Sequence, residues 1–594
     1  MDAGTRKIIE NFKRSCEYLR GYDFVSKELS RQPDDKNLQY YAVLFLARSG
    51  AYKQAQKMYD KYKLTNAADE DFMALGARLL KDKALNEPAR NRSQSLLNAA
   101  KAYESIYEKT HSDYPGINAA TLYWLSGKKQ AAKILARDCM KIASDRGPKE
   151  GMGEYYRFAT IAEALIIIGQ FDEARNTLEK AIAHAKNDWS EISGTHKQLS
   201  LILPREHVID VLQPLARPGV IHFSGHMMSS NDSTGRFHPK SEEVITDAIC
   251  RELDHLNVGY GYGSLASGAD IMISEALLAR NASLQVVLPF DIDEFVDISV
   301  APAGEEWVTR FENCIEKANH VMYATEDHYL GDDSLFHYTS RLAMGMAVQK
   351  SYNLATSVYQ FAVWDGEPPT GPAGVAADIV YWKSRSLPSV LINSVSGDRV
   401  APPHENTHIE FASKPGQRTP KAMLFADVKG FSKLSDTELL VFIEHVLGAM
   451  GEVLAGYEDE VIISNTWGDG LFVVMKDVMS AAACALELQQ IMEALDHHGI
   501  GLPEHISLRI GGHYGPVYEI FDPILKKTNY FGSHVSRAAR IEPVTPPGDV
   551  YVTLQFAAEL AIEKGSEYSA EYVGVMPAAK NSGNMAMYVL RKNH

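Results

Sequence analysis

The chain has 594 residues, of which 45% are hydrophobic and 23% are charged. This balance is typical of a folded, water-soluble protein, and at about 150 residues per domain the length predicts three or four domains. Acidic residues outnumber basic ones by 76 to 60, a net charge of -16, which argues against nucleic acid as a partner.

The cysteines and the apolar runs indicate where the protein resides. Five cysteines are scattered singly along the chain, which favours a reducing compartment and argues against structural zinc. The N-terminus lacks the apolar stretch of a secretory signal. The apolar run Ala164–Gly169 is far shorter than the roughly 20 residues that cross a bilayer. We therefore expect a cytoplasmic protein with no membrane partner.

Residues 1–215 carry a helical pattern. Three stretches each combine an apolar helix, a turn glycine and a second helix with small residues on its contact face, with the glycines at Gly50, Gly127 and Gly169. They resemble tetratricopeptide helix pairs, which stack because a single pair cannot bury its apolar face. The resemblance implies either a concave surface for a partner or neighbouring domain, or a packing scaffold.

Residues 216–395 alternate short β-rich runs with helical ones. This alternation predicts a Rossmann-like α/β domain with a mostly parallel sheet and ligands at the carboxyl ends of its strands. The expected strands are Val220–Phe223, Val258–Tyr262, Leu284–Leu288, His320–Ala324, Gln360–Trp364 and Ser389–Asn393.

Two glycine-rich loops, Gly261–Asp270 and Trp364–Gly374, each follow an expected strand and open a helix. Backbone amides in this setting can hold phosphate, although the glycines could equally serve tight turns alone. The loops resemble the SLOG group of nucleotide-binding domains, which includes lysine-decarboxylase-like and DNA-processing A-like proteins. The resemblance implies a nucleotide-like ligand, and a sensor fits better than a hydrolase because the second loop departs from the enzymatic pattern. The residues expected to line the site are Gly225, Gly263, Ser264, Gly268, Gly371 and Gly374.

The stretch 396–420 is rich in Pro, Ser, Gly and charge and is expected to be a linker, followed by a mixed α+β domain over 421–594. Two carboxylates stand out in that domain, Asp427 after an apolar strand and Asp469 at the tip of a hairpin. Asp469 alone would be only a turn signal. Together the two could hold the pair of hard cations that a triphosphate needs, while the turn at Gly430 and Phe431 offers backbone amides to its phosphates.

An ordered series of motifs in this domain resembles the class III nucleotidyl cyclase catalytic domain, the adenylate and guanylate cyclase family. The resemblance implies a homodimer with active sites at the interface, where Asp427 and Asp469 bind two Mg²⁺ or Mn²⁺ ions. It further implies attack of the ribose 3'-hydroxyl on the α-phosphorus of a nucleoside triphosphate, releasing pyrophosphate. The motifs are "FADVKGFSKLS", "NTWGDGLF", "GGHYGPVY", "NYFGSHVSRAARI" and "GDVYVT".

The partner chain would complete each active site with Ser536 and Arg540. Four residues apart, they would share one face of a helix. By resemblance Arg540 stabilises charge on the phosphate, while Ser536 stands where the family has a ribose-orienting asparagine, which predicts a slower enzyme or a shifted substrate. Lys580 matches a family lysine that contacts the triphosphate, with a solvated surface lysine as the alternative.

The base-reading positions also depart from the family pattern. Adenine-specific members have a lysine and an aspartate where this chain has Asn465 and Asn529. Amides both donate and accept hydrogen bonds, so they could read adenine, guanine or a pyrimidine. ATP is the first expectation for a cyclase regulated by its N-terminal sensor domains. The alternatives are a UTP or CTP cyclase in antiviral signalling and a catalytically silent cyclase fold in a ligand-sensing scaffold.

Overall fold

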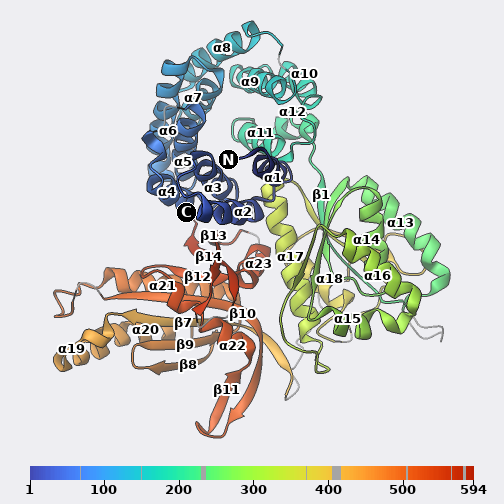
Figure 1. Ribbon diagram of the computed structural model, residues 1–594, viewed down its shortest axis with the longest axis vertical. Helices are drawn as coiled ribbons and strands as arrows, with labels where there is room; N and C mark the ends of the chain where they lie inside the picture. Colours follow the sequence, from blue (N-terminus) through green and yellow to red (C-terminus); the bar gives the residue numbers. More distant parts are fainter. Residues whose placement is uncertain are drawn as a thin grey trace.

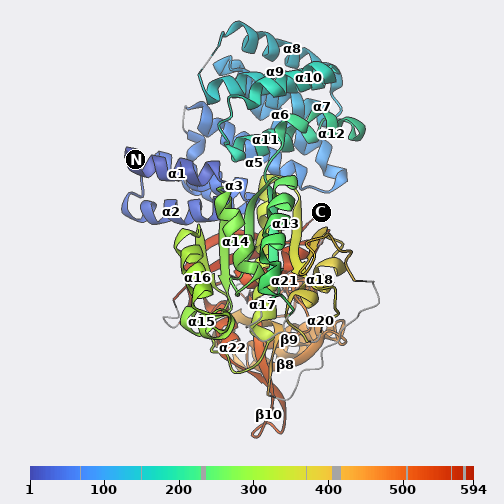
Figure 2. The same cartoon turned by 90° about the vertical axis from the view of Figure 1, so that its right-hand side faces the viewer.

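The computed structural model describes residues 1–66, 69–148, 150–228, 236–369, 371–403, 416–503, 506–563, 565–579 and 583–593. Figure 1 shows three regions: a ring of helices, a central α/β region and a C-terminal region built on a second sheet. In Figure 2 the helical region lies at one end of the molecule and the β10 arm projects at the other. This arrangement confirms the expected fold class.

The N-terminal region is helical throughout its described residues. The turn glycines of the three expected helix pairs, Gly50, Gly127 and Gly169, have φ of 91°, 88° and 93°, a conformation that costs glycine little because it has no Cβ. The helices are α1 (Ala3–Arg14), α2 (Tyr18–Arg31), α3 (Lys36–Arg48), α4 (Tyr52–Lys61), α5 (Glu70–Leu85), α6 (Ala89–Thr110), α7 (Asp113–Leu125), α8 (Lys129–Asp145), α9 (Met152–Ile168), α10 (Phe171–Ile182), α11 (Trp189–Ser200) and α12 (Arg205–Val211).

The stacked helices curve until their two ends meet (Figure 1). The hydroxyls of Tyr18 and Ser190 lie 2.9 Å apart, and the Arg48 guanidinium lies 2.7 Å from the Glu191 carboxylate. The concave surface expected from the repeats is therefore the inside of a closed ring.

The central sheet is parallel, with strand order β4-β3-β2-β1-β5-β6. All the expected strands form, as β1 (Gly219–Gly225), β2 (Val258–Gly263), β3 (Ser283–Leu288), β4 (His320–Tyr323), β5 (Val358–Trp364) and β6 (Ser389–Asn393). The helices that pack on the sheet and on one another are α13 (Glu242–His255), α14 (Ala269–Ala279), α15 (Ile292–Ser299), α16 (Glu305–Lys317), α17 (Ser334–Leu354) and α18 (Val375–Ser384).

The C-terminal sheet is mixed, with strand order β13-β14-β12-β10-β7-β9-β8 and β11 paired to β10. β7 begins at Arg418, inside the stretch expected as a linker. The strands are β7 (Arg418–Lys429), β8 (Val461–Trp467), β9 (Gly470–Met475), β10 (Ser507–Asp522), β11 (Lys527–Phe531), β12 (Val550–Thr553), β13 (Tyr568–Pro577) and β14 (Asn584–Lys592). The helices are α19 (Asp436–Val441), the π-helix Phe442–Leu447, α20 (Gly448–Ala455), α21 (Val478–Ala494), α22 (Ser533–Ala538) and α23 (Leu554–Ile562).

The central and C-terminal regions are packed tightly together through α17 and α23. A Cβ added to Gly345 of α17 would lie 2.1 Å from the carbonyl oxygen of Ala558 in α23, so the two helices approach at backbone distance. Beside this contact, Arg341 donates to Glu559 at 2.9 Å, and Glu559 also accepts from the Tyr381 hydroxyl at 2.8 Å. The interface therefore combines close packing with a buried, hydrogen-bonded ion pair.

The short N-terminal segment 15–23 contacts both of the other regions. Lys350 of α17 lies 2.6 Å from Glu17, and the Tyr260 hydroxyl on β2 donates to the backbone carbonyl of Ser15. On the C-terminal side, the Tyr572 hydroxyl on β13 donates to Asp23 at 2.6 Å. One continuous apolar core accordingly includes residues from all three regions.

Candidate active site

Asp427 and Asp469 converge where β7 ends and β9 begins, and we call this side of the C-terminal sheet the metal-binding edge. Asp427 lies on β7 directly opposite Gly470 on β9, so the register places it beside Asp469 in the β8–β9 turn. Burial raises the pKa of Asp469 above its ordinary value, and the neighbouring Asp427 adds to the increase. The structure thus brings together the two carboxylates expected to bind metal.

Arg509 and Glu542 complete this cluster, and the sequence interpretation missed both. Arg509 on β10 is the register partner of Asp427 and donates to its carboxylate at 2.7 Å. Arg509 also forms an ion pair with Glu542, whose pKa burial raises to about 7. An arginine alternating with apolar residues in the strand "SLRIGG" is the signal that could have been noticed.

The donor set suits divalent metal but needs substrate to complete it. Among the described residues no cluster of three or more His, Cys, Asp or Glu side chains could hold a metal ion. Mg²⁺ typically takes one or two carboxylates together with substrate phosphates, and Asp427 and Asp469 supply two. Arg509 lies against Asp427, so its guanidinium provides the positive charge there without an ion.

The two residues expected from the partner chain lie in and just after α22, with only Ser536 inside the helix. It begins after Gly532, whose φ of 137° favours glycine, and ends at Ala538. Arg540 therefore lies in the following turn, where its backbone N–H donates to the Arg537 carbonyl. The prediction that Ser536 and Arg540 share one face of a helix is wrong, because the helix ends between them. Among the described residues, no hydrogen bond or ion pair joins Ser536 or Arg540 to Asp427 or Asp469.

A chain of buried polar groups anchors α22. His534 shares a hydrogen bond with His513 at 2.7 Å, and His513 with the Thr553 hydroxyl at 2.8 Å. Burial, together with nearby arginines, lowers the pKa of both histidines well below the usual value, so both are neutral at pH 7. On its other side, His534 contacts the hydroxyl of Thr325 from the central region at 3.1 Å.

The two base-reading candidates each contact a charged neighbour. Asn465 on β8 accepts from the Lys527 ammonium at 2.8 Å, and Asn529 on β11 donates to Asp522 at 3.2 Å. A lysine and an aspartate therefore lie beside the positions where adenine-specific relatives carry those residue types.

The turn at Gly430 and Phe431, expected to bind phosphate at the start of a helix, is not followed directly by an α-helix. Gly430 has φ of 97° and caps a 3₁₀ turn, Phe431–Lys433, while the next α-helix begins only at Asp436. The Phe431 ring packs on Phe442 at 5.0 Å between centroids, so this side chain has a structural role. Lys580 lies outside the described residues.

The glycine-rich loops of the central region lie at the carboxyl ends of β1, β2 and β5. A Cβ on Gly225 would lie 2.3 Å from Ala269, and one on Gly268 would lie 2.5 Å from the backbone of Met228, so these two positions require glycine for close packing. Gly263 packs against Phe223, whereas no described atom lies within 4 Å of a Cβ on Gly371 or Gly374.

Buried polar atoms gather beside the first loop. The hydroxyls of Ser264 and Ser267 have no hydrogen-bond partner among the described residues. Burial raises the pKa of Asp270, and that of Asp378 to about 7. The structure therefore groups Gly225, Ser264 and Gly268 with two buried carboxyl groups that the sequence interpretation did not include.

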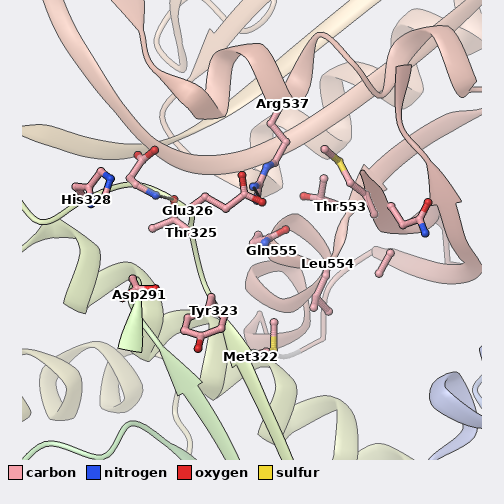
Figure 3. A pocket seen from close by; sticks show the side chains of 14 residues that line it. Asp291, Met322, Tyr323, Thr325, Glu326, His328, Arg537, Thr553, Leu554 and Gln555 are labelled. Carbon is pink, nitrogen blue, oxygen red and sulfur yellow. Dashed lines mark hydrogen bonds and ion pairs between the residues drawn. The ribbon is translucent and has the colours of Figure 1, made fainter. Parts of the chain in front are cut away.

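A cavity of about 610 Å³ lies between the central and C-terminal regions. Figure 3 shows Tyr323 from the central region and Thr553 and Gln555 from the C-terminal region around it. The Glu326 side chain extends toward Arg537, and its carboxylate lies 3.7 Å from the guanidinium. Neither Asp427 nor Asp469 lines the cavity. This cavity is therefore separate from the carboxylate cluster and adjoins α22 instead.

Comparison with known families agrees with this arrangement. Residues 415–592 match the family model of the adenylate and guanylate cyclase catalytic domain, and residues 20–123 match that of the tetratricopeptide repeats-sensor family. The C-terminal region is therefore a class III cyclase catalytic domain, preceded by a tetratricopeptide-type region.

Curated relatives share this part of the chain. "Putative adenylate cyclase 3" of Rhizobium meliloti (strain 1021) is 33% identical over 141 residues, covering 22% of each chain. "Adenylate cyclase" of Mycosarcoma maydis is 27% identical over 161 residues, covering 23% of this chain and 6% of its own. The chain thus spans about a fifth or less of these relatives.

Among solved structures, the adenylyl cyclase CyaB from P. aeruginosa is 16% identical with a TM-score of 0.27, covering 31% of this chain and 98% of its own. The guanylyl cyclase Cya2 is 21% identical with a TM-score of 0.27, covering 30% and 96%. None of the helices that our structure describes is long and apolar enough to span a membrane.

Proposed function

We propose that the protein is a nucleotidyl cyclase that converts a nucleoside triphosphate into a 3',5'-cyclic nucleotide and pyrophosphate. The observation that carries this proposal is the convergence of Asp427 and Asp469 across the β7–β9 register within a cyclase catalytic domain. In the reaction the ribose 3'-oxygen loses its proton and bonds to the α-phosphorus, and the bond from that phosphorus to pyrophosphate breaks.

Asp427 and Asp469 would hold two Mg²⁺ or Mn²⁺ ions. When bound, such ions favour ionisation of the attacking hydroxyl and stabilise negative charge on the phosphates. The residues of the chain itself set the electrostatics of this edge. Arg509 forms an ion pair with Asp427, and its guanidinium would be available to phosphate oxygens when these carboxylates hold metal.

Ser536 and Arg540 would act from the second chain of a homodimer. Arg540 would stabilise charge that develops on the phosphate, and the Ser536 hydroxyl would bind the ribose. Two observations support a site shared between chains. Within the described part of the chain, neither residue forms a hydrogen bond or ion pair with Asp427 or Asp469, and large apolar side chains are exposed around the metal-binding edge and the β10–β11 arm. These side chains are Leu440, Ile443, Trp467, Phe521, Ile524 and Leu525.

ATP is the proposed substrate. Lys527 lies against Asn465 and Asp522 against Asn529. Adenine-specific relatives read the base with a lysine and an aspartate. Lys527 and Asp522 would do so here, either by contacting the base directly or by orienting the two amides. A lysine can donate to a ring nitrogen of adenine and an aspartate can accept from its exocyclic amine.

The central region would bind a small nucleotide-like ligand that regulates the cyclase. The support is the group of buried polar atoms at Ser264, Ser267 and Asp270, next to the N-terminus of α14, which begins directly after Gly268. Buried hydroxyls without partners are costly unless a ligand or water satisfies them, and a strand end next to a helix N-terminus is a common place for phosphate.

The experiment that tests the cyclase is incubation of the purified full-length protein with ATP, GTP, CTP or UTP and Mn²⁺, followed by chromatography for cyclic nucleotide and pyrophosphate. We expect product, with ATP preferred. Preference for UTP or CTP would correct the base assignment. Absence of product from all four, with and without nucleotide ligands for the central region, would favour a catalytically silent fold.

A further inference from the structure

A carboxylate of the central region makes direct contact with α22, the helix that carries Ser536 and leads into the turn of Arg540. Asp327 lies in the segment 324–333 that leads from β4 to α17. It accepts a 2.5 Å hydrogen bond from the hydroxyl of Ser533, the first residue of α22, and lies 3.8 Å from His534. Two successive residues of α22 thus face one side chain from a different region of the chain.

Asp327 is itself held firmly in place. Its backbone N–H donates to the Thr325 hydroxyl at 3.0 Å, and its carboxylate lies 3.2 Å from the guanidinium of Arg418. That guanidinium also binds Asp332 through two bonds of 2.6 and 2.7 Å. Because Arg418 is only 3% exposed, removing one of its acidic partners leaves a largely desolvated charge less well compensated.

The opposite side of α22 offers no room for a different orientation. A Cβ on Gly515 would lie 2.2 Å from the ring of His534, and the His513 ring stacks on His534 with an interplanar angle of 7°. The first turn of α22 is therefore fixed between β10 on one side and the segment containing Asp327 on the other.

We infer that Asp327 is a positioning residue for the active site: by holding Ser533 and Arg418, this central-region carboxylate sets the orientation of α22 and thereby of Ser536 and Arg540. The inference rests on the proposed cyclase activity, in which α22 of one chain acts on substrate bound at the carboxylates of the other. A movement of the β4–α17 segment would then change catalysis in the partner's active site without altering the metal-binding edge.

The first test compares Asp327→Ala and Asp327→Asn with Asp333→Asn, a matched control in the same segment. The Asp333 side chain is exposed and forms no hydrogen bond or ion pair with the described residues of the C-terminal region. We expect Asp327→Ala to lower kcat roughly tenfold with little change in KM, since it removes a charge-assisted hydrogen bond from a group that orients catalytic residues. Asp327→Asn, which keeps an acceptor for Ser533, should lose less.

A reciprocal variant identifies the contact itself. Ser533→Ala removes the same hydrogen bond from the other side, so the double variant Asp327→Ala/Ser533→Ala should be little slower than Asp327→Ala alone. Fully multiplied losses in the double variant would show that the two side chains act separately, and would overturn the inference.

Mixing experiments separate positioning of α22 from general damage. In a mixed dimer, Asp327→Ala supplies an intact metal-binding edge and Asp427→Ala supplies an intact α22, so this mixture should regain part of the activity. Mixing Asp327→Ala with Arg540→Ala leaves α22 defective in both chains and should regain none. The reverse pattern, rescue by Arg540→Ala but not by Asp427→Ala, would place the damage at the metal-binding edge and refute the inference.

Hydrogen exchange tests the contact without any enzymatic readout, so failure of the proposed function does not affect it. In the full-length protein, the amides of α22 should exchange several-fold faster in Asp327→Ala than in the wild type or in Asp333→Asn. Unchanged exchange of α22 would show that Asp327 does not hold the helix.

Discussion

The two halves of the proposed active site are built in opposite ways. The carboxylate edge lies within one sheet: Asp427, Asp469 and Arg509 are brought together by the register of neighbouring strands. The α22 half depends on another region, because Thr325 and Asp327 of the central region contact its first turn. In the proposed mechanism, a movement of the central region would therefore alter catalysis through α22 while the metal-binding edge stays intact.

The largest expected effect on activity comes from a substitution at the metal-binding edge. Asp427→Ala removes one of two proposed metal ligands and should lower kcat by about a thousandfold, as measured by cyclic nucleotide production. Asp459→Ala, at an exposed turn of the same domain, is the matched control and should retain wild-type activity. Substantial activity in Asp427→Ala would contradict its assignment as a metal ligand.

The contact between regions should respond strongly to a single methyl group. Gly345→Ala would place a Cβ against the backbone of α23, and we expect a loss of roughly 1–3 kcal/mol in stability from overpacking. Gly451→Ala in α20 has open space around the added atom and should be neutral or slightly stabilising, since alanine favours helix. Thermal unfolding of both variants checks this. Equal midpoints would show that the α17–α23 contact yields easily.

The neutral histidines make the α22 half sensitive to pH. The pKa values of His513 and His534 are lowered in the fold, so below about pH 6.5 the unfolded segment takes up protons that the folded one does not. The contribution of the two neutral histidines to the stability of the folded state is complete above about pH 6.5. It declines as the pH falls from there toward their pKa values in the folded protein. The positive charges of Arg537 and Arg418 lower the pKa of His534 further, although the carboxylate of Asp327, which favours the protonated ring, lies 3.8 Å away.

Hydrogen exchange of α22, corrected for intrinsic rates, measures this decline. Protection in the wild type should fall by up to about tenfold per pH unit for each histidine below about pH 6.5. His513→Gln should show a shallower decline, because one titrating group is removed while other buried histidines are unchanged. The same slope in both proteins would contradict the assigned role of His513.

The smallest expected effect concerns the base. Lys527→Ala removes the exposed cation that contacts Asn465, and we expect KM for ATP to rise only a few-fold because exposed charges contribute little. Lys526→Ala, on the adjacent turn, is the control. An unchanged ratio of kcat/KM for ATP and GTP in Lys527→Ala would exclude Lys527 from base recognition.

Local patterns in the sequence predicted most of the fold but little of the connection between regions. The turn glycines and the β-rich runs predicted the helix pairs and the positions of the central strands along the chain, since both depend on neighbouring residues. The Arg509–Asp427 pair depends on the register of strands 82 residues apart, and the Asp327–Ser533 contact joins residues separated by 206 positions. Neither contact can be predicted from the hydrophobic periodicity of a single helix or strand. The π-helix Phe442–Leu447 likewise lies within an ordinary helical pattern.

The segment 15–23 has a practical consequence for handling the protein. Through its contacts with Lys350, Tyr260 and Tyr572, this N-terminal segment connects the helical region to both of the other regions. A shortened protein that starts beyond residue 23 would leave the buried Tyr572 hydroxyl without its acceptor and Lys350 without its carboxylate. The cyclase domain cut out alone would therefore expose surfaces that the intact chain keeps covered, and its behaviour would describe a fragment rather than the intact protein.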